Sequence, residues 1–149
     1  MSTIYLETFI KADIRKVFDL ARDIDFHSES TSHTNEKAIA GRTTGLIENN
    51  ETVTFRAKHL GVYQTHTSKI VDMEIPYQFT DYMLKGTFKS LHHQHLFKEV
   101  EGGTLMTDIL KFESPFGIVG KLFNFFFLKK YMKNFIERRN ALLKEFSER

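Results

Sequence analysis

Histidines and carboxylates recur at alternating positions in segments of the chain that have the pattern of β-strands. His93 and His95 alternate in one segment, and Asp108 lies among apolar residues in the next. Because alternate residues of a strand share a face, these side chains are predicted to point to the inner side of a sheet. A buried carboxylate needs a partner, and histidine, which titrates near neutral pH, can both pair with it and transfer protons.

The same alternation places further polar side chains on this inner face. The complete polar set is His59, Gln64, His66, Asp81, His93, His95 and Asp108. Apolar residues with the same alternation, together with residues of the last helix, are predicted to line the space beside it: Phe55, Phe79, Met83, Phe97, Met106, Leu110, Phe112, Phe125 and Met132. Together these residues are the candidate ligand-binding set.

Three roles for the polar set remain open. Its members could form hydrogen-bonded pairs that brace the sheet, or they could orient the head group of a ligand in a pocket. A third role is catalysis, in which Asp108 with His93 or His95 moves a proton in an aldol cyclisation or a dehydration. These three residues are candidates only, and no catalytic residue is assigned.

A metal site is a further interpretation of the two alternating histidines. His93 and His95 could bind one ion, with Asp108 or His59 completing the ligand set. No closed set of ligands with characteristic spacing is present, and the chain contains no His-Glu-x-x-His motif. Phosphate-binding glycine loops and a Gly-x-Ser-x-Gly motif are also missing from the sequence. We therefore expect no metal and no cofactor.

The composition is typical of a single globular domain spanning residues 1–149. Of the 149 residues, 41% are hydrophobic, and the chain contains no cysteine. A chain of this size buries about two-thirds of its surface without needing disulfides, and the lack of cysteine excludes a thiol nucleophile. The first residues lack a signal-peptide pattern, and no run of 18 apolar residues occurs. We expect a cytoplasmic protein.

Periodicity and turn residues predict the order of the elements. A strand over 3–10 precedes a helix capped by Asp13 and a second short helix over about 25–30. Strand-like segments then follow at 35–40, 51–60, 62–73, 78–85, 89–100 and 104–113. A helical pattern covers 116–146. The predicted class is α+β, with a strongly curved antiparallel sheet of about seven strands wrapped around the long C-terminal helix.

This order and several motifs resemble the helix-grip fold, also called the START or SRPBCC fold, of the birch-pollen allergen type. The motifs are Phe55–Gly61, Val62-Tyr63-Gln64, Thr67–Ile70, Asp81-x-Met83, Gly86-x-Phe88, His93-Gln94-His95 with Phe97, and Gly102–Asp108. They are similar to the bacterial group described as cyclase/dehydrase-like or ligand-binding. The resemblance implies a hydrophobic cavity between the sheet and the last helix.

The end of the chain is basic and rich in phenylalanine. The apolar cluster from Phe123 to Leu128 precedes Lys129, Lys130 and Lys133, although the net charge of the whole chain is only +2. This cluster could be buried, form a homodimer contact, or touch an anionic membrane through the lysines. The low charge does not favour nucleic-acid binding.

The leading hypothesis is binding of a small hydrophobic or amphipathic ligand. A cyclase/dehydrase-like enzyme and an interaction module that docks through the last helix are the alternatives.

Overall fold

Seven strands form one antiparallel sheet in which β2 to β7 pair in sequence order, and β1 lies at the edge beside β7. The computed structural model describes residues 1–114, 117–118, 122 and 127–149. The strands are β1 (Ser2–Ile10), β2 (Lys37–Gly41), β3 (Thr52–His59), β4 (Val62–Glu74), β5 (Gln78–Lys85), β6 (Ser90–Val100) and β7 (Gly103–Glu113). Their order across the sheet is β1-β7-β6-β5-β4-β3-β2, which confirms the predicted number of strands and their antiparallel pairing.

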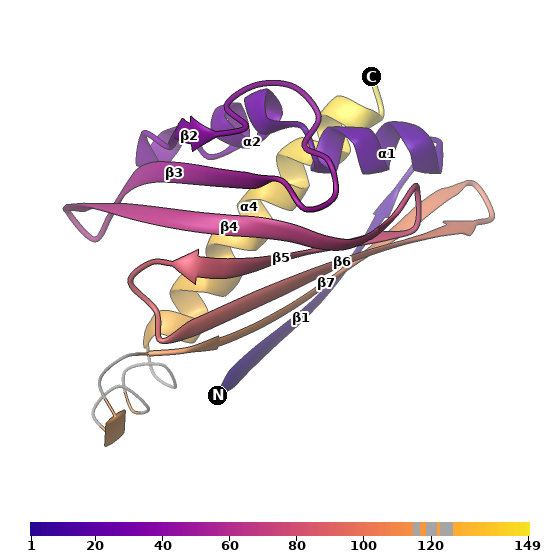
Figure 1. The fold of residues 1–149 in the computed structure, drawn as a ribbon. Coiled ribbons are helices and arrows are strands. Elements are labelled where there is room, and N and C mark those ends of the chain that lie inside the picture. Colours follow the sequence, from indigo (N-terminus) through magenta and orange to yellow (C-terminus); the bar gives the residue numbers. More distant parts are fainter. Residues whose placement is uncertain (115–116, 119–121, 123–126) are drawn as a thin grey trace.

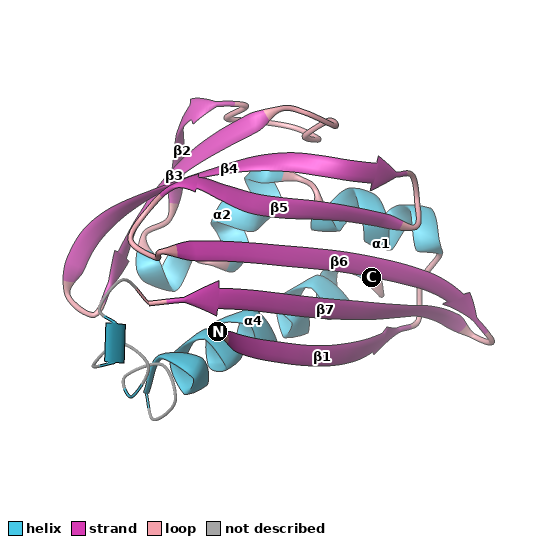
Figure 2. Cartoon of the chain, turned by 60° about the horizontal axis from the view of Figure 1, so that its bottom comes forward, coloured by secondary structure: helices cyan, strands magenta, loops and turns pink. Residues whose placement is uncertain are grey.

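The helices lie on one face of this sheet, which curves around the last of them (Figures 1 and 2). They are α1 (Ile14–Ala21), α2 (Ile24–Ser30), the short 3₁₀ helix η1 (Ser32–Thr34) and α4 (Lys129–Ser147). The arrangement confirms the predicted fold class. None of the helices in the described ranges is long and apolar enough to cross a membrane.

Aspartates determine where the first two helices begin. The side chain of Asp13 accepts a hydrogen bond from the backbone N–H of Arg15, so the predicted cap of α1 is confirmed. Asp23 accepts in the same way from Asp25 and Phe26. Because this cap precedes the predicted start, α2 begins at Ile24 rather than near residue 25.

The C-terminal helix presents a mixed face to the sheet. The predicted helix covered 116–146, whereas α4 runs from Lys129 to Ser147, and residues 115–116, 119–121 and 123–126 lie outside the description. The candidate Phe125 is among them. Arg139 and Asn140 are buried between Ile136 and Leu143, at the positions that an apolar stripe would occupy. Two polar side chains of α4 are therefore directed towards the sheet.

The strand register brings the candidate polar residues together. Asp81 of β5 pairs with His93 of β6, and Phe79 pairs with His95. On the other side of β6, His95 pairs with Asp108 and His93 with Leu110 of β7. Since side chains directly across a strand pair lie about 5 Å apart, three neighbouring strands contribute to one cluster.

Candidate ligand pocket and its polar cluster

A cavity of about 270 Å³ lies between the concave face of the sheet and α4. Its wall is mostly apolar and includes Val53, Phe55, Ala57, Ile70, Phe79, Leu91, Leu110, Met132, Phe135 and Ile136. An engineered apolar cavity of about 150 Å³ is large enough to bind benzene. The space in this chain therefore admits a molecule larger than one aromatic ring.

Most of the candidate residues line this cavity. They are Phe55, His59, Gln64, His66, Phe79, Asp81, His93, His95, Leu110 and Met132. Five described candidates do not line it: Met83, Phe97, Met106, Asp108 and Phe112. Strand alternation predicted correctly that these side chains lie on the inner side, but it could not separate the cavity wall from the packed core.

The packing partners explain the five exceptions. Phe97 and Met106 belong to the apolar core around α1, where the ring of Phe97 is 5.2 Å from that of Phe18. Met83 and Phe112 pack in a second core near the start of α4, where Phe88 covers Phe112. Asp108 lies beneath the cavity wall, among polar partners.

Asp108 is the centre of a buried hydrogen-bonded cluster. Its side chain is 1% exposed. The carboxylate lies 2.7 Å from His93 Nε2, 2.7 Å from Asn140 Nδ2 and 3.2 Å from Arg139 Nη2. Burial alone would raise the pKa of Asp108, but the Arg139 charge and the His93 hydrogen bond hold it well below its usual range. An ionised carboxylate accepts hydrogen bonds, so His93 donates its Nε2 proton to Asp108, and its Nδ1 lies on the side of Asp81.

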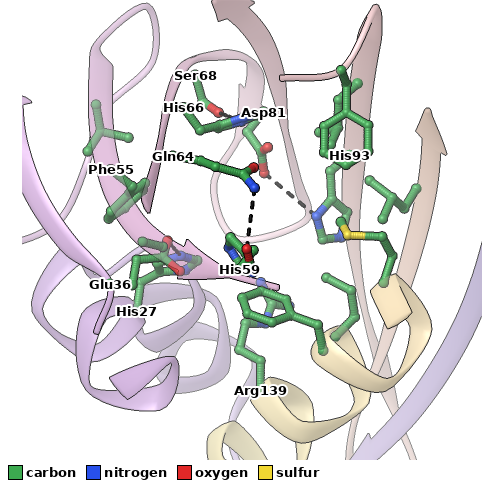
Figure 3. Close-up of a pocket in the computed structure, with 18 of the residues that line it drawn as sticks. His27, Glu36, Phe55, His59, Gln64, His66, Ser68, Asp81, His93 and Arg139 are labelled. Carbon is green, nitrogen blue, oxygen red and sulfur yellow. Dashed lines mark hydrogen bonds and ion pairs between the residues drawn. The ribbon is translucent and has the colours of Figure 1, made fainter. Parts of the chain in front are cut away.

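Asp81 carries the second carboxylate of the cluster and, unlike Asp108, faces the cavity. Figure 3 shows it beside His93, whose Nδ1 is 3.9 Å from Asp81 Oδ2. His95 Nε2 lies 2.7 Å from the same oxygen. Burial acts to raise the pKa of Asp81, but the hydrogen bond from His95 and the nearby imidazoles lower it below its usual range. The polar end of the cavity is therefore anionic at Asp81.

His95 is held in the neutral form between aromatic neighbours. Its ring stacks on His93 at 3.8 Å and on Phe79 at 4.3 Å between centroids. Burial, with a contribution from the neighbouring His93, lowers the pKa of His95 to about 4. Its Nδ1 atom is buried without a hydrogen bond among the described residues, 3.5 Å from Asp108 Oδ1.

Further polar side chains face the cavity from the opposite wall. His27 Nε2 is 2.8 Å from Glu36 Oε1, and His59 Nδ1 is 2.6 Å from the hydroxyl of Tyr131. Figure 3 shows His27 and Glu36 close together on the far side of the pocket from His93.

Glu36, His27, Tyr131 and Arg139 were missing from the predicted set, although they line the cavity. For Arg139 a signal existed, because it follows Ile136 by three positions on the apolar stripe of the helix.

Solved structures share this architecture along the whole chain. The protein TTHA0849 from Thermus thermophilus aligns with a TM-score of 0.78 at 18% identity, covering 97% of this chain and 95% of that one. A ginseng major latex-like protein from Panax ginseng aligns with a TM-score of 0.69 at 15% identity, covering 98% and 97%. The chain has the helix-grip fold.

Another helix-grip neighbour belongs to a larger protein. The di-domain ARO/CYC protein StfQ of the steffimycin biosynthetic pathway aligns with a TM-score of 0.78 at 12% identity. The alignment covers 98% of this chain and 50% of the di-domain StfQ chain. No model of a protein family matches the sequence, and no curated protein sequence matches it either. At these identities the likeness concerns the fold.

Proposed function

We propose that this helix-grip chain binds a small amphipathic molecule in the cavity between the sheet and α4. The observation that carries the proposal is a cavity of about 270 Å³ with a mostly apolar wall and a few polar side chains, among them Asp81 and His93. Ligand pockets generally combine such a wall with a few polar groups that orient the ligand. The apolar part of the ligand would pack against Phe55 and Phe135, with its polar part beside Asp81.

The charge at the polar end restricts the head group. Asp81 is ionised, and an ionised carboxylate only accepts hydrogen bonds. A hydroxyl or amine that donates to Asp81 therefore fits this end better than a free carboxylate, which would meet a like charge. This reasoning favours hydroxylated aromatic or isoprenoid molecules over fatty acids.

A fluorescent apolar probe tests the proposal. N-phenyl-1-naphthylamine is neutral and should bind with saturable, one-to-one fluorescence enhancement. Ala57→Phe places a ring in the cavity from β3 and should abolish that binding. Lys58→Phe adds the same ring at the exposed neighbouring position and should leave binding unchanged. Equal binding by wild type and Ala57→Phe, or no saturable binding by the wild type, would contradict the proposal.

A cyclase-like activity is a second candidate, favoured by the pair that faces the cavity. Asp81 and His93 could exchange a proton with a bound polyketide-like substrate, whereas Asp108 is enclosed and serves to orient His93. The likeness of the fold to the ARO/CYC protein StfQ also supports this candidate. A linear poly-β-ketone should be converted to a cyclised aromatic product, and Asp81→Asn should abolish the conversion while the variant still binds the probe. Undiminished turnover in Asp81→Asn would exclude this role.

A further inference from the structure

Three side chains at the polar end of the cavity direct potential metal ligands to one point. Asp81, His93 and His95 each have one potential ligand atom that lies within 4.8 Å of those of the other two. The register of β5 with β6 produces this group, because Asp81 pairs with His93 and His95 follows two residues later on the same face. Asp81 and both histidines also line the cavity, so an ion held by them would be accessible from it.

The separations match those within a coordination shell. Metal–nitrogen and metal–oxygen bonds of about 2.0–2.2 Å in a tetrahedral site place neighbouring ligand atoms roughly 3.4 Å apart. Asp81 Oδ2 is 2.7 Å from His95 Nε2 and 3.9 Å from His93 Nδ1, distances that lie on either side of this value. Side-chain shifts of about half an ångström would bring these two separations to that value.

The second shell of the group is typical of a metal site. A histidine that binds a metal usually donates its other ring N–H to a carboxylate, which fixes the tautomer and the ring orientation. His93 Nε2 lies 2.7 Å from Asp108 Oδ1 and leaves Nδ1 directed towards Asp81. Arg139 and Asn140 hold Asp108 in turn.

The unpartnered nitrogen of His95 gives an independent indication. When neutral His95 donates its one proton from Nε2 to Asp81, the lone pair of Nδ1 is left in a buried position 3.5 Å from Asp108 Oδ1. A metal on Nε2 would move the proton to Nδ1, where it would point to the Asp108 carboxylate. Coordination would therefore give this buried atom a favourable partner.

We propose that Asp81, His93 and His95 bind one divalent first-row transition-metal ion, with its remaining coordination positions directed into the cavity. Two histidines and one carboxylate are the ligands of open non-haem iron sites and of many zinc sites. The cluster contains two carboxylates, and Arg139 pairs with one of them, Asp108. The positive ion would offset the charge of the other, Asp81. The inference deepens the proposed function, on which it rests, because an oxygen atom of the bound ligand would coordinate the ion.

Cobalt(II) is a suitable probe because its visible absorption reports the coordination number. Tag-free protein is treated with EDTA, dialysed against buffer containing cobalt chloride and analysed by absorption and elemental mass spectrometry. We expect one ion per chain, an absorption typical of four or five ligands, and a higher melting temperature, since binding to the folded state stabilises it.

Matched variants locate the ion. Asp81→Asn and His93→Gln preserve size and hydrogen bonding, and each should weaken cobalt binding by more than the roughly 10- to 100-fold that loss of a second-shell partner costs. His92→Ala removes the exposed histidine next to His93 on the same strand and should leave cobalt binding unchanged. Circular dichroism of each variant confirms that it is folded.

The outcomes separate this proposal from the function on which it rests. Any one of three results would overturn the metal site. These are absence of stoichiometric cobalt in the wild type, cobalt binding by Asp81→Asn and His93→Gln as tight as that of the wild type, or loss of cobalt binding in His92→Ala. Binding of N-phenyl-1-naphthylamine to the EDTA-treated protein is measured in parallel. Probe binding without cobalt binding would reject the metal site and leave the ligand pocket standing, whereas loss of both would reject both proposals.

Discussion

At the scale of single residues, the environment of each histidine follows from its side of the strand and from the neighbour that it meets. His92 is exposed, whereas His93 and His95 are buried against carboxylates on the other face of β6. Alternation along the strand determines which of these histidines are buried and which is exposed. The carboxylate that each buried histidine meets depends on β5 and β7, which contribute Asp81 and Asp108.

Glu36 leads to a prediction at this scale. It is 8% exposed and lies 2.8 Å from His27. Burial raises its pKa, but the charge and hydrogen bond of His27 outweigh that effect and bring the pKa below the ordinary value of 4.5. A lowered pKa stabilises the folded state above pH 4.5, and the contribution is lost as the pH falls below that value and through the folded-state pKa.

Glu36→Gln should therefore reduce the free energy of unfolding by about 1.5–3 kcal/mol at pH 7, as expected for a hydrogen bond to a charged group. The difference from wild type should shrink as the pH falls below about 4.5. Urea denaturation over this range measures both effects. Glu145→Gln, which removes an exposed ion pair with Arg149, should change stability by no more than about 1 kcal/mol. A constant difference between Glu36→Gln and wild type at all pH values would contradict the prediction.

At the scale of elements, α4 does more than cover the sheet. Its buried face carries Arg139 and Asn140, which contact Asp108 of β7. These two side chains of the helix thus complete the polar cluster, while Ile136 and Leu143 pack in the two apolar cores. The buried guanidinium of Arg139 is the charged group through which α4 contacts the polar cluster.

Arg139→Leu should destabilise the chain by about 3–5 kcal/mol, because it leaves the Asp108 carboxylate buried without its cation. Chemical denaturation measures the change in the free energy of unfolding. The neighbouring Arg138 is exposed, so Arg138→Leu should alter it by no more than about 0.5 kcal/mol. Similar losses in the two variants would show that the buried ion pair is not the source of the effect.

At the scale of the whole molecule, members of two apolar cores line the cavity. One core joins α1 and α2 to the sheet, and the other joins the start of α4 to β6 and β7. A molecule in the cavity would contact both the sheet and α4 and would therefore stabilise the fold as a unit.

Ligand binding should consequently raise the melting temperature. N-phenyl-1-naphthylamine at 100 times its Kd should stabilise the folded state by about 2.7 kcal/mol. For a chain of this length that corresponds to roughly 5–10 °C. Scanning calorimetry with and without the probe measures the shift, and Ala57→Phe should show none. An equal shift in wild type and Ala57→Phe would indicate binding outside the cavity.

The sequence by itself determined the order of the elements along the chain, the Asp13 cap of α1 and the inward direction of Asp81, His93, His95 and Asp108. These features depend on backbone periodicity and on residues a few positions apart, so a single chain displays them. The tertiary structure decided which of the inward residues face the cavity and which partner each one meets. Asp108 is enclosed because Arg139, 31 residues away, reaches it, and Asp81 meets His95 across 14 residues. Such contacts depend on strand register and helix placement, which involve the packing of the whole chain and leave no local pattern in the sequence.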